Sequence, residues 1–115
     1  MREKIRDKGR LEHILEAIEN VFEFMAGVSF EEYQSNKMLR FAVVKNLEII
    51  GEASYHLTPN LKDNSPEIEW RVIIGMRHVL VHDYFLIGDE VVWNVVQKDL
   101  LPLKENISLL LDTID

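Results

Sequence analysis

The chain of 115 residues contains no cysteine, which excludes disulfide bonds and thiolate metal sites. It has only three prolines and five glycines, and no segment shows repeats, low complexity or the alternation of a strand. No apolar run approaches the roughly 20 residues that a membrane span requires. The charged N-terminus is not followed by the apolar region of a signal peptide. We therefore expect one globular domain over residues 1–115, located in the cytoplasm and without a membrane partner.

Positive charge is also scarce, because 13 lysines and arginines face 20 aspartates and glutamates and leave a net charge of −7. A protein that coats nucleic acid through bulk electrostatics is usually basic. Any contact of this chain with RNA must therefore be local, or compensated by a partner.

The first half of the chain carries apolar residues at helical spacing. One helix is predicted from Leu11 to Met25. Its solvent-exposed face is expected to carry the acidic residues Asp7, Glu12, Glu16, Glu19 and Glu23. Ser29 and Glu32 predict a capping box for a second helix, from Phe30 to about Leu57. Its apolar arc is wide, which is typical of a helix that is central or shared with another subunit. Gly51 within it marks either the close approach of another helix or a weak spot.

The second half predicts further helices of the same kind. Ser65, Pro66 and Glu67 have the residue types of a helix start, so a third helix is expected to open near Pro66 and to end near Asp83 or Tyr84. A fourth begins at Gly88-Asp89 and is kinked or split at Pro102. The expected fold is an all-α antiparallel bundle of four to five helices, paired as a two-fold homodimer.

The third predicted helix is mostly apolar. Its last eight residues, 77–84, nevertheless contain five polar or charged ones: Arg77, His78, His82, Asp83 and Tyr84. Polar groups inside a buried helix are costly unless they are partnered or used. At about 100° per residue, His78 and His82 share a face, whereas Arg77 and His82 diverge by roughly 140°. To act at one point, the arginine must wrap around, the helix must unwind near Val81, or two copies must pool their groups across a two-fold axis.

Each of these residues also has a structural explanation. A histidine on a bundle helix is more often structural than functional, an arginine usually pairs with an acid, and Tyr84 could be a core aromatic with a wet hydroxyl. Glu48 and Glu52 lie one turn apart on the second helix, where they form either partners for Arg77 or His82 or a solvated edge. His13 and His56 stand alone in the sequence and are interpreted as surface residues.

The order Arg77, four residues, His82, one residue, Tyr84 resembles the signature of the HEPN superfamily, and specifically of its HepT-like toxin branch. The flanking residues are similar to that branch as well, and the resemblance covers roughly residues 10 to 115. It rests on Trp70, Ile74-Gly75-Met76, Val92-Trp93, Leu101-Pro102 and the segment Leu47-Glu48-Ile49-Ile50-Gly51-Glu52-Ala53. His78 is a departure, because many relatives carry asparagine there.

The resemblance implies an all-helical dimer that cleaves RNA without a metal or other cofactor, at a composite site where the two signature motifs meet. His82 would then be the general acid/base, and Arg77 would stabilise the phosphate in the transition state. His78, Asp83 and Glu52 would be auxiliary residues. Attack by the ribose 2′-hydroxyl would leave a 2′,3′-cyclic phosphate and a 5′-hydroxyl.

The same resemblance implies a partner, a small nucleotidyltransferase antitoxin that can transfer AMP onto Tyr84 and so block the site. Two other functions stay open. One is a non-catalytic HEPN module that binds nucleotide or serves as an adaptor for a nucleotidyltransferase, which the net acidity favours. The other is a metal-binding bundle that uses His78, His82 and Asp83, although the glutamate of a His-Glu-x-x-His site is missing.

Overall fold

The computed structural model of the chain describes residues 2–83 and 86–114, which are helical or irregular and contain no strand. This confirms the all-α class. The long helices are α1 (Arg2–Met25), α3 (Lys37–His56), α5 (Trp70–His82) and α7 (Leu100–Thr113). Short helices connect them: α2 (Phe30–Ser35), α4 (Pro59–Asp63) and α6 (Asp89–Asn94). No helix within the described ranges is long and apolar enough to cross a membrane.

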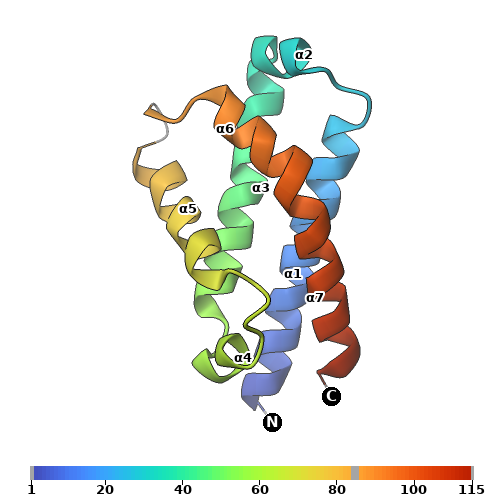
Figure 1. The fold of residues 1–115 in the computed structure, drawn as a ribbon, viewed down its shortest axis with the longest axis vertical. Helices are drawn as coiled ribbons and strands as arrows, with labels where there is room; N and C mark the ends of the chain where they lie inside the picture. Colours follow the sequence, from blue (N-terminus) through green and yellow to red (C-terminus); the bar gives the residue numbers. More distant parts are fainter. Residues whose placement is uncertain (1, 84–85, 115) are drawn as a thin grey trace.

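Helix α3 lies between α1 and α5, with α7 packed against α1 (Figure 1). This position explains the wide apolar arc of its sequence, because α3 buries one side against each neighbour. Val44 and Leu47, which lie off the main apolar stripe, are both buried. The core joins α1, α3 and α7 through fully buried aliphatic side chains: Leu11, Ile14, Ile18, Val21, Val43, Leu47 and Ile107. The wide apolar arc is therefore explained by the central position of α3 within the chain.

The predicted second helix is in fact two helices, so its uninterrupted course from Phe30 to Leu57 is wrong. Ser29 does accept from the backbone N–H of Glu32, as a capping residue should. The break comes at Asn36, whose backbone is extended and whose side chain accepts from Leu39 N–H, thereby capping α3. Asparagine competes in this way with the helical backbone, and the apolar pattern does not reveal the interruption.

The predicted start of the third helix near Pro66 is also wrong, because α5 begins at Trp70. Ser65 is completely buried, and its hydroxyl donates to Leu61 C=O at 2.7 Å and accepts from Trp70 Nε1 at 2.9 Å. The hydroxyl is therefore committed to these partners and does not cap a helix. Its residue type suits a cap, but its tertiary contacts decide otherwise.

The region before Pro102 is irregular, as its position in the sequence predicts. Between α6 and α7 lies one π-helical turn, η2 (Val95–Asp99), in which Leu100 N–H donates to Val95 C=O. Proline has no N–H and its ring crowds the preceding turn, which accounts for a distortion at this point. The helical path nevertheless continues through η2 into α7 (Figure 1).

Asp7 does not belong to the wet face of α1, and that prediction is wrong. Only 4% of it is exposed, and its carboxylate accepts from both Thr58 N–H and Thr58 Oγ1, at 3.0 and 2.6 Å. Asp7 is four residues before Leu11 and shares its face, so the helical spacing itself places it on the core side. The two hydrogen bonds fasten α1 to the start of α4.

Gly51 is the point at which α5 approaches α3. A Cβ built at Gly51 would lie 2.2 Å from the Cβ of Arg77 and 3.2 Å from the carbonyl oxygen of Ile73. The glycine is therefore required by close approach, which settles the choice that its sequence position left open.

Replacing Gly51 with alanine should lower the free energy of unfolding by about 1–3 kcal/mol, because the added methyl group forces α3 and α5 apart. Urea unfolding followed by circular dichroism measures the change. Gly9 supplies the matched control, since a Cβ there meets nothing within 4 Å. Gly9→Ala should raise stability by about 0.5–1 kcal/mol. Equal effects of the two substitutions would contradict the close-approach role of Gly51.

Candidate active site at the contact of α3 and α5

Arg77 points from α5 toward α3. Because its Cβ sits against Gly51, its guanidinium reaches the next residue of α3, and Arg77 Nε lies 2.5 Å from Glu52 Oε2. The arginine side chain is 32% exposed, so it is held in place and still open to solvent. A guanidinium has five N–H donors, so a carboxylate bound at Nε leaves donors for a phosphate.

Glu52 also binds His56, one turn further along α3. His56 Nε2 donates to Glu52 Oε1 at 3.0 Å. This hydrogen bond and the positive charge of Arg77 lower the pKa of Glu52 below its ordinary value of 4.5, against a smaller opposing effect of desolvation. Arg77, Glu52 and His56 thus form a connected chain across the two helices, with the carboxylate ionised at neutral pH.

His78 and His82 lie side by side on another face of α5, with ring centroids 4.5 Å apart. Both residues are exposed. Arg77 contacts Glu52 on α3, while the ring of His82 lies beside that of His78 at an angle of 48°. The divergence predicted by the helical wheel is therefore present in the fold. Helix α5 remains regular through His82, and the unwinding near Val81 that would bring Arg77 and His82 together is not observed.

Asp83 ends α5 and is exposed. Its N–H donates to Val79 C=O at 2.7 Å, and its own carbonyl accepts from Leu86 N–H at 2.8 Å. Tyr84, the predicted modification site, lies outside the described residues.

A groove of about 450 Å³ opens beside Arg77, between α1, α3 and α5. Its polar lining consists of Arg10, His13, Lys45, Glu48, Glu52, His56 and Arg77. His13 and His56 are exposed, which confirms the expectation that they lie at the surface. They are not isolated, however, because the fold gathers both into one groove with Arg77. The sequence does contain a signal for His56, since it follows Glu52 at the spacing of an ion pair on one helix face.

The metal-binding alternative needs a third ligand beside His78 and His82. The described part of the chain contains no group of three or more histidine, aspartate or glutamate side chains arranged to hold a metal ion.

Residues 14–110 match the family described as ribonuclease HepT-like, and the chain belongs to that family. It is 43% identical over 97 residues to a protein of Thermococcus cleftensis named provisionally as ribonuclease HepT, a match that covers 84% of this chain and 88% of that protein. It is 35% identical over 102 residues to a protein of Methanocaldococcus jannaschii named provisionally as an RNase, with coverage of 89% and 94%. No solved structure gives a significant match.

The lowered pKa of Glu52 predicts a pH-dependent contribution to stability. A carboxylate whose pKa is lower in the folded than in the unfolded state stabilises the fold above pH 4.5, and this contribution is lost as the pH falls through the folded pKa. The difference in unfolding free energy between the wild type and Glu52→Gln should therefore be largest near neutral pH and shrink below pH 4.5. Chemical denaturation at a series of pH values measures it.

Glu48→Gln, one turn earlier on α3, controls for the loss of one negative charge in the same groove. A wild-type advantage over Glu52→Gln that grows on acidification would contradict the assigned pKa shift.

Proposed function

We propose that the chain is an endoribonuclease that cleaves RNA by attack of the ribose 2′-hydroxyl, without a metal, at a site built from two copies. The observation that carries this proposal is the fixed position of Arg77, held by Glu52 at the edge of an open groove. A partly exposed arginine with a set orientation is suited to bind a phosphate that gains charge in the transition state.

His82 supplies the second part of the proposed chemistry. An imidazole can take a proton from the 2′-hydroxyl or give one to the leaving 5′-oxygen at neutral pH. His82 is exposed on α5 and has His78 as its neighbour, so an approaching RNA backbone can reach both rings. His78 would orient His82 or contact the phosphate, and Asp83 would be an auxiliary residue beside His82.

The separation of Arg77 and His82 within one chain supports the composite site. Each residue projects from a regular helix in its own direction, and a two-fold axis beside α5 would bring the arginine of one copy to the histidine of the other. Homodimer formation is thus part of the proposal, because the catalytic set is incomplete without it.

A ribonuclease of this kind needs control, and the proposed partner is a nucleotidyltransferase antitoxin in a toxin–antitoxin pair. Transfer of AMP from ATP to the Tyr84 hydroxyl, with release of pyrophosphate, would place a phosphate and a bulky base two residues from His82. The added negative charge would compete with RNA for Arg77. The alternative of a non-catalytic adaptor module is favoured by one observation, the net charge of −7.

The purified wild-type protein should cleave single-stranded RNA in EDTA and leave 2′,3′-cyclic phosphate ends, whereas His82→Ala should lose about 10²–10⁴-fold in rate, the usual contribution of general acid–base catalysis. Gel electrophoresis and mass spectrometry of the products measure both. Glu90→Gln, an exposed acid outside the groove, is the control and should retain full activity.

The intact mass of the protein must first exclude an adenylate on Tyr84, because the modification would itself prevent RNA cleavage. Intact RNA after incubation with unmodified wild-type protein would reject the ribonuclease and favour the adaptor.

A mixed dimer tests whether the site is composite. One copy carries Arg77→Gln and the other His82→Ala, and two different tags allow only the mixed dimer to be purified. If Arg77 and His82 act across the interface, one of the two sites is intact and the mixed dimer should have about half the wild-type rate, although both parent variants are inactive. If both residues act from the same chain, the mixed dimer should be as inactive as its parents.

A further inference from the structure

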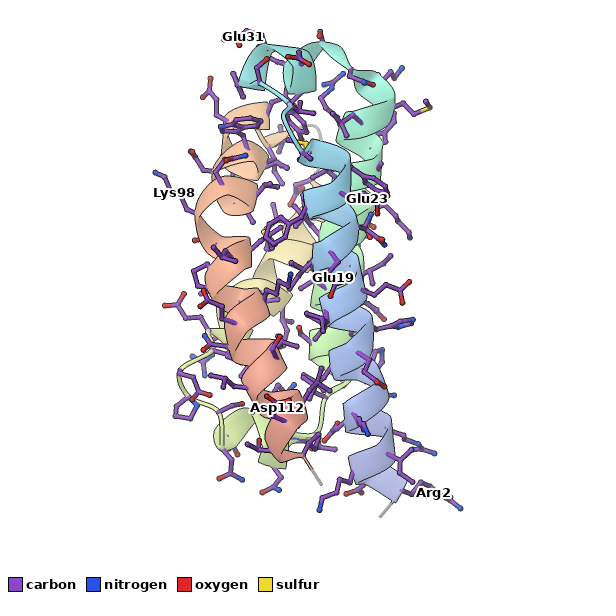
Figure 2. The ribbon with its side chains drawn as sticks, turned by 90° about the vertical axis from the view of Figure 1, so that its right-hand side faces the viewer. Arg2, Glu19, Glu23, Glu31, Lys98 and Asp112 are labelled. Atoms are coloured by element: carbon purple, nitrogen blue, oxygen red, sulfur yellow. The ribbon has the colours of Figure 1, made fainter. Side chains whose placement is uncertain are left out.

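Charge is unevenly distributed around α1. At about 100° per residue, Arg2, Arg6, Arg10 and His13 fall within about 80° of one another, on one flank of the helix. Arg10 and His13 place this flank toward α3, because both line the groove with α3 residues. The acids Glu12, Glu16, Glu19 and Glu23 form a separate stripe, centred about 100° away. Glu19 and Glu23 are seen on this outer surface in Figure 2, with Arg2 at the end of the helix.

The other flank of α1 faces α7, where Lys104 lies over the ring of Phe22. Lys4 and Lys8 lie on this flank and are exposed. The basic residues of α1 are therefore divided between two sides, and only one side adjoins the candidate active site.

The groove beside Arg77 is locally basic although the protein is acidic. It holds three of the 13 lysines and arginines and two of the four histidines, against two of the 20 carboxylates. One of those carboxylates, Glu52, is already bound to Arg77 and His56. Within the described residues, no carboxylate lies within 4 Å of a charged nitrogen of Arg2, Arg6, Arg10 or Lys45. Their charge is thus available to an external anion.

We propose that Arg2, Arg6, Arg10 and Lys45, here termed the basic track, bind successive phosphates of the RNA strand that enters the site at Arg77. On α1 the track rises by about 12 Å from Arg2 to Arg10, at about 1.5 Å per residue, and it continues across the groove through Lys45 to Arg77. A row of cations at one edge of a site matches a repeating polyanion better than a single nucleotide. The inference rests on RNA being the substrate, as proposed above.

The track also explains how an acidic protein can hold RNA. Its contacts are with phosphates, so they add affinity and direction but carry no sequence information. The acidic stripe on the neighbouring surface of α1 would repel a strand that leaves the track, which confines the bound RNA to the groove.

The test uses the full-length protein with His82→Ala, so that RNA stays intact during the measurement. Arg10→Gln with Lys45→Gln removes two charges of the track, and Lys4→Gln with Lys8→Gln removes two charges from the other flank of α1. Fluorescence anisotropy with a labelled, unstructured single-stranded RNA measures affinity at several salt concentrations. Light scattering and circular dichroism verify that each variant keeps its oligomeric state and its fold.

The track variant should bind RNA severalfold more weakly at low salt, and its slope of log affinity against log salt should be shallower by about 1.4, or about 0.7 for each lost phosphate contact. The control variant should keep the slope of the parent. If the partly buried Arg10 does not tolerate glutamine, Arg6→Gln with Lys45→Gln replaces the first pair, since both side chains are exposed.

The basic track would be overturned if the track variant and the control variant lost RNA affinity equally, or if the His82→Ala parent did not bind RNA. The two proposals fail separately. If the wild type cleaves RNA but the two double variants bind RNA equally well, the basic track is rejected and the ribonuclease proposal is retained. If the wild type does not cleave RNA but only the track variant loses RNA affinity, the basic track is retained and the ribonuclease proposal is rejected.

Discussion

The close approach of α5 to α3 at Gly51 is the constraint on which the candidate site depends. Without a side chain at Gly51, the Cβ of Arg77 can rest against the α3 backbone, and the guanidinium then falls beside the adjacent Glu52. A larger residue would move α5 outward and take Arg77 away from its carboxylate. One missing methyl group therefore sets both the packing of two helices and the position of the residue that is proposed to stabilise the reacting phosphate.

Glu52 has a double role in this arrangement. It orients Arg77 and binds His56, and these two contacts favour its charged form and lower its pKa. An incoming phosphate would meet an arginine that is already desolvated on one side and fixed in direction, which reduces the reorganisation needed on binding. The same carboxylate competes with the phosphate, so the contact tunes the arginine as well as positioning it.

Within one chain, Arg77 and His82 are directed to different sides of α5. Three ways of uniting Arg77 with His82 follow from the helical wheel. The structure shows a regular α5 and an arginine directed to α3, so neither helix unwinding nor a wrapped arginine is present. The remaining way is the pooling of groups between two copies, and the proposed ribonuclease therefore depends on a dimer. The basic track on α1 would then bring the RNA strand to that junction.

The sequence by itself determined the helical class, the core stripes of α1 and α7, the cap at Ser29, the irregularity before Pro102 and the motif residues on α5. These follow from periodicity and local chemistry, which act between residues a few positions apart. The same periodicity places Asp7 on the core side of α1, four residues before Leu11.

The tertiary structure alone decided the break at Asn36, the late start of α5 and the groove that unites His13, His56 and Arg77. Ser65 shows the reason most clearly, because its hydroxyl is used by Leu61 and Trp70 rather than by a helix start. From the sequence, Gly51 was consistent with either a destabilised position in the helix or the close approach of another helix. The packing of α5 against it decides for close approach. Such choices depend on partners that are distant in the chain, and only packing brings those partners within reach.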